Sequence, residues 1–261
     1  MSGQPLVSIV TPSFNQVPYL EAAISSVIDQ EYPNIEYILI DGGSTDDSVD
    51  IIKTHSGKFA YWISEPDRGQ TDAINKGFAH ATGKYLAWLN ADDRLRPNAV
   101  SEAVQFLEAH ADAGMVYGDA EYIDSRGRVV GNFPAAQTDY RALRRGYVHI
   151  PQQAAFWRRD LWAQVSPLDT SFTFAMDYDL WVRLAKISKL QYLTRLWAQF
   201  RLHSDSKTLQ NDQRAWDEML KVHFREGGSW FSIIGAKYWI RRVIAPLIHF
   251  QRSRMLRFPA H

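Results

Sequence analysis

A short apolar stretch that leads into two adjacent acids constrains this chain more than any other feature of its sequence. The mostly apolar residues 84–89 show no polar alternation, and Asp92 and Asp93 follow closely. An apolar run of this length is typical of a strand that is buried on both faces. Because ligands of open α/β sheets bind beyond the carboxyl ends of the strands, the two acids would lie at a binding edge.

The two carboxylates themselves suggest a cation site. They repel each other unless a positive charge lies between them, and hard divalent cations prefer oxygen ligands. Mg²⁺ in proteins is commonly held by one or two carboxylates together with phosphates of the substrate. A helix cap is the alternative, since Asp93 comes shortly before Pro97 and aspartate commonly begins helices. The stretch alone leaves both interpretations open.

The pattern around this stretch predicts an α/β fold with a mostly parallel, Rossmann-like sheet. The strands expected in the first half occupy residues 6–10, 35–40, 59–64 and 84–89, each followed by a helical pattern. Strands that alternate with helices at short intervals form parallel sheets with helices on both faces. After Gly114 the order changes, and we expect extended segments at residues 115–119, 120–124, 129–133, 154–157 and 191–202, with helices at 139–146, 177–186 and 207–226.

The composition excludes several classes of protein. There are no cysteines, which rules out disulfides, zinc–thiolate sites and cysteine nucleophiles and fits a reducing compartment such as the cytoplasm. The formal net charge is zero and the sequence shows no basic groove signature, so nucleic acid is disfavoured as a partner. The polar residues 1–5 run directly into the first strand, so we expect no signal peptide.

Acids follow three of the expected strands, at Asp41, at Asp67, and at Asp92 with Asp93. In a parallel sheet these strand ends lie along one crevice. Asp41 could accept a hydrogen bond from a base or a ribose hydroxyl, and the Asp92–Asp93 pair could hold ribose and metal. No glycine-rich phosphate loop follows the first strand, so a metal and its neighbours would balance the phosphate charge. These residues predict a nucleotide-diphosphate site.

Short motifs follow one another along the chain, at Thr11–Asn15, Asp41–Asp46, Asp72–Gly77, Asn90–Asp93, Asp177–Trp181 and Arg201–Ser204. In order and spacing they resemble the motifs of family 2 glycosyltransferases, which have the GT-A fold. The resemblance covers roughly residues 5 to 210. It implies a GT-A catalytic domain over residues 1–228, with a nucleotide-binding half at 1–113 and an acceptor-binding half at 114–228.

The resemblance also implies roles for single residues. The nucleotide sugar would be bound by Thr11, Pro12, Asn15, Asp41, Asp67, Asp92 and His203. Asp93 would ligate Mg²⁺ or Mn²⁺, and it would do so largely alone because Asn90 stands where many members carry an acid. Asp177 would be the general base, with Met176 in the place of the family's glutamate. Without the resemblance, Asp177 would be interpreted as an acid stabilised by a helix N-terminus.

The activity that the resemblance implies is metal-dependent, inverting transfer of a hexosyl group from a nucleotide-diphosphate sugar. UDP is the expected nucleotide, and the acceptor would be a hydroxyl of a glycan or glycolipid in surface polysaccharide synthesis. Two alternatives remain open. A sugar-phosphate nucleotidyltransferase would need a glycine-rich loop after the first strand, yet residues 11–15 contain no glycine. A catalytically inactive nucleotide-sugar binding protein would not need the acids at Asp93 and Asp177.

Residues 229–261 form a basic, aromatic C-terminal tail that contains no acid. Lys237, Arg241 and Arg242 interrupt its apolar stretch, which makes a membrane-spanning segment costly. Aromatic side chains and cations together favour an interfacial segment on an anionic membrane surface. We therefore expect peripheral binding to the cytoplasmic membrane face. Packing on the catalytic domain and an oligomer contact are the alternatives, and the sequence does not reveal the oligomeric state.

Overall fold

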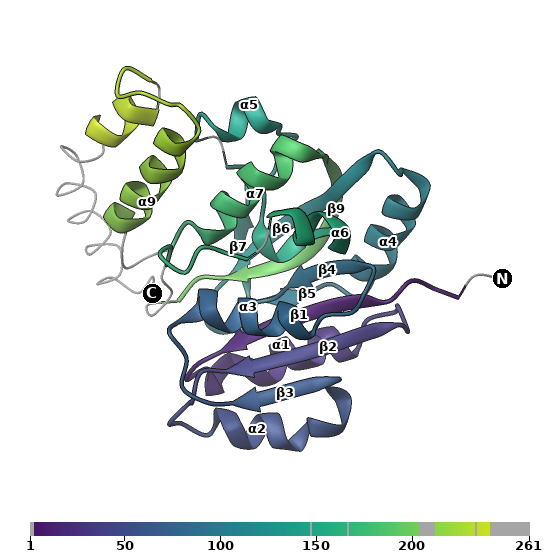
Figure 1. Cartoon of the computed structure of the whole chain (residues 1–261). Coiled ribbons are helices and arrows are strands. Elements are labelled where there is room, and N and C mark those ends of the chain that lie inside the picture. Colours follow the sequence, from purple (N-terminus) through teal and green to yellow (C-terminus); the bar gives the residue numbers. More distant parts are fainter. Residues whose placement is uncertain (1–2, 147, 166, 204–211, 233, 241–261) are drawn as a thin grey trace.

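The computed structural model describes residues 3–146, 148–165, 167–203, 212–232 and 234–240. Within them, one nine-stranded sheet runs through the molecule in the order β3-β2-β1-β4-β8-β6-β9-β5, with β7 paired to β6 (Figure 1). The strands are β1 (Val7–Ser13), β2 (Ile35–Asp41), β3 (Tyr61–Ser64), β4 (Tyr85–Trp88), β5 (Arg94–Leu95), β6 (Ala113–Ile123), β7 (Val129–Asn132), β8 (Ala155–Arg158) and β9 (Lys189–Arg201).

The first half of the sheet has the expected parallel arrangement. Strands β3, β2, β1 and β4 all pair in parallel, and Val7 of β1 lies opposite both Ile35 and Tyr85. Their carboxyl ends therefore meet at one edge, where Ser13 lies opposite Asp41. This arrangement confirms the α/β fold expected from the alternating pattern and brings the acidic strand ends of the sequence to one side of the sheet.

The second half of the sheet is mixed. Strand β8 is antiparallel to β4 and β6, β6 is parallel to β9, and β5 is antiparallel to β9. The two strands expected at residues 115–119 and 120–124 are one strand, which pairs with β9 on both sides of an irregularity between Tyr117 and Ala120. Gly118 is needed there since a Cβ would lie 2.5 Å from the carbonyl oxygen of Arg195 on β9. The two-residue strand β5 was not expected at all.

Helices cover both faces of the sheet (Figure 1). They are α1 (Val17–Ile28), α2 (Ser48–Thr54), α3 (Gln70–His80), α4 (Ala99–Ala109), α5 (Tyr140–Leu143), α6 (Arg159–Val165), α7 (Met176–Ile187) and α9 (Asp212–Arg225), with short 3₁₀ turns η1 (Ser56–Lys58) and η2 (Gln152–Ala154). Neighbouring strand residues point to opposite faces, so Ile9 belongs to the core under α1 and α4 while Val10 belongs to the core under α3 and α7.

Tryptophans dominate the second of these two cores. The rings of Trp88, Trp157 and Trp181 lie 5.6–5.9 Å apart between their centroids, and all three side chains are buried. Trp162 packs against the same group through Phe78. Trp157, Trp162 and Trp181 therefore serve the packing of the core.

The C-terminal part of the described chain packs on the second half of the sheet. Helix α9 contacts α7, and the tail begins beyond it at residue 229. Residues 204–211 of the expected helix and motif, and residues 241–261 of the expected membrane tail, lie outside the described residues. In the described ranges, no helix combines the length and apolar character that crossing a membrane requires.

Candidate active site

A cavity of about 910 Å³ lies beyond the carboxyl ends of β1, β2 and β4 and extends under α9. Its nucleotide-side wall includes Pro12, Ser13, Gly42, Asp67, Asn90 and Asp92. Its far wall includes Phe133, Val148, Ile150, Phe174, Asp177, Trp216 and Met219. Pro12, Asp67, Asp92, Asp177 and His203 were all predicted from sequence, and the fold brings them to this one cavity. Thr11, Asn15, Asp41 and Asp93 do not line it.

Asp41 lies in the protein interior behind the cavity wall and holds the turn that forms this wall. Its side chain is fully buried, and its Oδ2 accepts hydrogen bonds from the backbone nitrogens of Gly43 (3.1 Å) and Ser44 (2.9 Å) and from the Ser64 hydroxyl (2.7 Å). Its Oδ1 accepts from the Ser44 hydroxyl at 2.5 Å. These bonds hold the turn after β2, so its neighbour Gly42 rather than the Asp41 carboxylate borders the cavity.

Gly42 lets Asp67 approach the turn closely. A Cβ at Gly42 would lie 2.7 Å from Oδ2 of Asp67, which is too short for a real contact. The other oxygen of Asp67 accepts a hydrogen bond from the Gly69 nitrogen at 2.7 Å. Asp67 is therefore fixed beside the β2 turn, with Oδ2 toward Gly42 at the cavity wall.

Thr11 and Asn15 brace the same wall from behind. The Thr11 hydroxyl lies 3.1 Å from the Tyr37 hydroxyl in the core. Asn15 adopts a left-handed backbone conformation with φ of 52°, and its Oδ1 accepts a hydrogen bond from the Thr45 nitrogen at 2.8 Å. The loops after β1 and β2 are thus tied together. Thr11 therefore acts within the sheet and Asn15 through the loops, and neither side chain lines the cavity.

Asp92 and His203 meet at the cavity although 111 residues separate them in the chain. His203 Nε2 lies 3.1 Å from Asp92 Oδ2, and the His203 ring packs against Tyr19 with centroids 4.8 Å apart. Within the described residues, Nδ1 of His203 is buried without a hydrogen-bond partner. Arg201 fixes the loop of Asp92 from below, because its Nε donates to the Asp92 carbonyl oxygen at 2.8 Å.

Asp93 points into the protein. Its side chain is 1% exposed, and its Oδ1 accepts a hydrogen bond from the Arg201 backbone nitrogen at 2.8 Å. Burial, together with the neighbouring Asp92 carboxylate, raises the pKa of Asp93 well above its usual value. This placement does not support direct metal ligation by Asp93. It does not support the helix cap either, since the residue that precedes helix α4 is Asn98. Asp93 instead joins the β4 end to β9.

Asp92 and His203 are the residues that fit a divalent cation here. Adjacent ligand atoms of an octahedral Mg²⁺ or Mn²⁺ lie about 3 Å apart, and the Asp92 and His203 atoms are 3.1 Å apart. The described part of the chain contains no cluster of three or more histidines, cysteines or acids suited to a metal. A cation at this pair would therefore need phosphate oxygens and waters as its remaining ligands, which is the usual arrangement for Mg²⁺.

Asn90 occupies the position where an acid was expected from the family pattern. Its Oδ1 accepts from Gln70 Nε2 at 2.7 Å, and its Nδ2 donates to Gln152 Oε1 at 3.2 Å. Gln152 in turn donates to the carbonyl oxygen of Trp88 at 2.7 Å. This chain of amides forms a neutral polar floor, which contributes hydrogen-bonding groups to the cavity without adding a charge.

Asp177 lies in the first turn of α7 and faces the far part of the cavity. Its Oδ1 accepts a hydrogen bond from the Tyr178 nitrogen at 2.7 Å. Burial, with a smaller contribution from the charge of Glu218, raises the pKa of Asp177 to about 6. A helix N-terminus alone would lower this pKa, so the environment opposes the dipole and makes Asp177 a stronger base than an ordinary aspartate.

The turn before α7 is held from two sides. On one side lies Asn75, which belongs to the Asp72–Gly77 motif on α3. Its Nδ2 donates to the Leu168 carbonyl oxygen and its Oδ1 accepts from the Leu168 nitrogen, both at 2.9 Å. On the other side, the buried Glu218 of α9 accepts from the backbone nitrogens of Thr173 (3.0 Å), Phe174 (2.7 Å) and Ala175 (2.9 Å). No local pattern indicates this role of Glu218, because a single acid in a helix ordinarily faces solvent.

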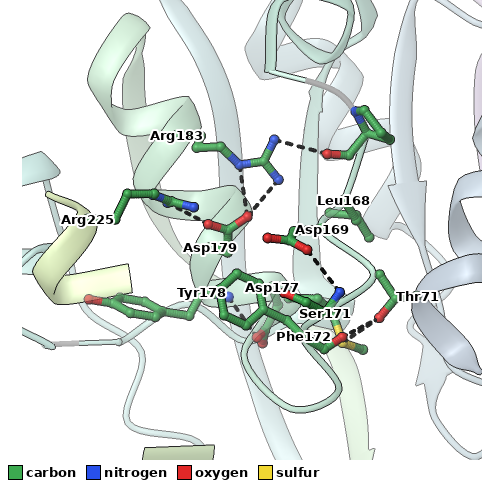
Figure 2. A network of polar contacts seen from close by, with 12 residues as sticks. Thr71, Leu168, Asp169, Ser171, Phe172, Asp177, Tyr178, Asp179, Arg183 and Arg225 are labelled. Carbon is green, nitrogen blue, oxygen red and sulfur yellow. Dashed lines mark hydrogen bonds and ion pairs between the residues drawn. The ribbon is translucent and has the colours of Figure 1, made fainter. Parts of the chain in front are cut away.

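An ion-pair group fixes α9 to α7 just behind Asp177. Figure 2 shows Asp179 between two arginines. Arg183 Nε donates to Asp179 Oδ2 at 2.9 Å, and Arg225 NH2 lies 2.5 Å from Asp179 Oδ1. Asp179 is 1% exposed, and the two cations compensate the cost of burying its carboxylate. Asp177 therefore sits on a helix whose position is determined by packing, ion pairs and the Glu218 contacts together.

Comparison with known proteins agrees with this geometry. The model of glycosyl transferase family 2 matches residues 8–164. An uncharacterized glycosyltransferase of Mycobacterium tuberculosis is 36% identical over 190 residues, which cover 72% of this chain and 71% of the relative. A PGL/p-HBAD biosynthesis glycosyltransferase of Mycobacterium bovis is 31% identical over 183 residues, or 69% of each chain.

Solved structures show the same fold at low sequence identity. Residues 1–349 of S. aureus TarS, in complex with UDP-GlcNAc, superpose with a TM-score of 0.69 at 14% identity, covering 92% of this chain and 73% of that fragment. The mannosyltransferase PcManGT of Pyrobaculum calidifontis, in complex with GDP-Man and Mn²⁺, gives 0.66 at 19% identity, covering 92% and 71%. The chain therefore belongs to glycosyl transferase family 2, and it is a glycosyltransferase with the GT-A fold.

Proposed function

We propose that this glycosyltransferase moves a sugar from a nucleotide-diphosphate sugar to a hydroxyl of a glycolipid or glycan acceptor, with inversion at the anomeric carbon. The observation that carries the proposal is the pairing of one basic carboxylate, Asp177, with the Asp92–His203 pair in a single cavity. The first residue suits proton removal, and the pair suits the binding of a diphosphate through a cation. UDP is the first nucleotide to test.

The donor would lie against the β1–β2–β4 edge of the cavity. Pro12 and Asp67 border the space for base and ribose, and the buried Ser13 hydroxyl, which lacks a partner within the described residues, can hydrogen-bond to the nucleotide. Asp92 and His203 would hold Mg²⁺ or Mn²⁺. Such a cation, when bound, stabilises the charge of the leaving diphosphate as a Lewis acid. TarS and PcManGT were solved with UDP-GlcNAc and with GDP-Man and Mn²⁺, which supports a donor of this class.

Asp177 would then act on the acceptor. Its carboxylate takes the proton of the acceptor hydroxyl while the hydroxyl oxygen bonds to the anomeric carbon and the bond to the nucleotide diphosphate breaks. Attack from the face opposite the leaving group inverts the configuration. A positioned base of this kind contributes roughly 10²–10⁴-fold to the rate. With a pKa of about 6, Asp177 is mostly ionised at neutral pH and still basic enough for this task.

The far wall of the cavity supports an acceptor with an apolar part. Phe133, Ile150, Phe174, Trp216 and Met219 surround this region. Burial of apolar acceptor surface there stabilises the complex at about 25 cal/mol per Å². The name of the mycobacterial relative, a PGL/p-HBAD biosynthesis enzyme, points in the same direction. These features support a lipid-linked or similarly apolar acceptor, and we propose that the reaction takes place in the cytoplasm at the membrane face.

A panel of nucleotide sugars tests the proposal. The full chain is incubated with UDP-, dTDP- and GDP-sugars, with and without Mn²⁺, and with an apolar glycoside as acceptor, and nucleotide-diphosphate release is measured. Acceptor-dependent release from one donor class is the expected result. Donor binding in calorimetry without any release would instead favour the catalytically inactive binding protein, and the Asp177→Asn chain is the matched control for background hydrolysis.

A further inference from the structure

A second cavity, of about 460 Å³, lies between α5 and the C-terminal end of α9, and three arginines line it. Arg141, Arg144 and Arg145 line it from α5 and the turn after it, together with His223, Ser229 and Ser232. We call it the arginine pocket. Across the described residues, no carboxylate forms an ion pair with any of the three arginines. Three like charges around one hollow repel each other, so the pocket favours an anion.

The far wall of the arginine pocket is fixed in place. His223 is buried, its Nδ1 lies 2.8 Å from the carbonyl oxygen of Arg144, and its Nε2 lies 2.8 Å from the Ser232 hydroxyl. His223 thus joins α9 both to the segment of the arginines and to the turn at residues 229–232. The guanidinium groups supply planar donors that match phosphate oxygens. The hollow therefore has the charge and the hydrogen-bond donors that suit a phosphate group.

Exposed aromatic side chains lie beside the arginine pocket, in the segment that supplies its two serines. Phe231 is 103% exposed, and Trp230, Trp239 and Ile240 are each about half exposed. Tryptophan is enriched where membrane proteins meet the lipid headgroups. The whole of residues 229–261 contains six lysines and arginines and no acid. An apolar, cationic surface of this kind complements an anionic lipid layer in charge as well as in hydrophobicity.

We propose that the arginine pocket binds the phosphate of an anionic phospholipid while Trp230, Phe231 and Trp239 enter the headgroup layer. This deepens the proposed function, because α9 borders both cavities: Trp216 and Met219 face the acceptor region, and His223 faces the arginine pocket. A membrane bound at the pocket would lie at the acceptor end of the active site. An apolar acceptor could then reach Asp177 from the lipid layer.

Vesicle flotation of the full chain tests the site independently of catalysis. We expect binding to vesicles that contain phosphatidylglycerol, weak binding to pure phosphatidylcholine, and a decrease with added salt. The triple variant R141Q/R144Q/R145Q should bind anionic vesicles roughly 100-fold more weakly, since each cation near such a surface contributes roughly fivefold. The matched control K53Q/K58Q/R126Q removes three exposed cations elsewhere, two of them near α2 at the opposite end of the molecule, and should bind like the parent (Figure 1).

A second variant covers the possibility that the triple variant is unstable. Phe231 is fully exposed, so Phe231→Ser removes no packing contact, and it should weaken flotation while leaving thermal unfolding unchanged. Equal flotation of the parent and the arginine variant would overturn the proposal, as would absence of flotation at low salt. Inorganic phosphate that protects the parent against thermal unfolding, without any flotation, would show a site for free phosphate and would also overturn it. None of these readouts requires glycosyl transfer.

Discussion

Replacing Glu218 tests whether α9 sets the position and basicity of Asp177. In the Glu218→Ala chain, the shielded backbone nitrogens of Phe174 and Ala175 lose their acceptor. Each buried donor without a partner costs about 1–3 kcal/mol. We therefore expect the free energy of unfolding to fall by about 2–6 kcal/mol, which lowers the melting temperature of a chain of this size by about 5–25 °C.

Glu218→Gln separates the charge from the hydrogen bonds. Oε2 of Glu218 accepts from all three backbone nitrogens, so an amide oxygen in that position keeps most of the contacts, at a cost of about 1 kcal/mol. The negative charge is lost, however, and this charge helps burial to raise the pKa of Asp177. In the variant that pKa should fall below about 6.

The assay is the pH dependence of kcat. Transfer needs ionised Asp177, so the parent should lose activity as the pH falls through about 6, and the Glu218→Gln chain should lose it at a lower pH. Asp217→Asn is the matched control, because it removes a negative charge from the same helix. Oδ1 of Asp217 accepts a hydrogen bond from the Tyr238 hydroxyl and does not contact the turn before α7. A Glu218→Gln profile that coincides with the parent, or that moves to higher pH, would refute this reasoning.

The remaining predictions concern the acids of the site. Asp177→Asn should bind the donor normally in calorimetry and lose transfer by at least about 10²-fold. The same variant should have a higher melting temperature than the parent at pH 8 and the same melting temperature at pH 4. The pKa of Asp177 is about 6 in the folded chain against an ordinary 3.8, so its ionisation destabilises the fold as the pH rises between these values. Equal melting temperatures at both pH values would contradict the burial of Asp177. Asp92→Asn should abolish stimulation by Mn²⁺ in the release assay with little change in melting, and unchanged stimulation would remove Asp92 from the metal site. Asp93→Asn should retain stimulation by Mn²⁺ and should not melt below the parent at pH 8, because its amide oxygen can still accept from the Arg201 nitrogen and the buried charge, whose pKa burial raises, is gone.

The first half of the fold was readable because its signals are local. Each strand of β1 to β4 is an apolar run of a few residues, and the acids that follow β2, β3 and β4 need no distant partner to be recognised. The second half offered fewer such signals. Strand β5 has two residues and exists only because Arg94 and Leu95 pair with β9, more than a hundred residues later. No pattern within a window of ordinary length contains that information.

The candidate site divides in the same way. Strand ends and motifs located Asp67, Asp92 and Asp177 at the cavity, but they could not tell which of two adjacent acids faces it. That choice between Asp92 and Asp93 depends on the backbone nitrogen of Arg201, which is 108 residues from Asp93. The role of Glu218 could not be predicted from the sequence for the same reason, because the backbone nitrogens that it accepts from lie in a turn 43–45 residues earlier. Side-chain direction at a site is a tertiary property.

The single sheet has a consequence for how the chain folds. Strand β4 pairs on one side with β1, from the beginning of the chain, and on the other with β8, about 70 residues later. Strand β5, next in sequence to β4, completes the far edge of the sheet beside β9. The β4–β8 and β5–β9 pairs join the two halves of the sheet at two places, so unfolding should be one cooperative transition. Refolding should be slow, because most strand pairs join distant segments. A nascent chain that ends near residue 113 would present the apolar edge of β4 unpaired, a surface on which other chains can add strands.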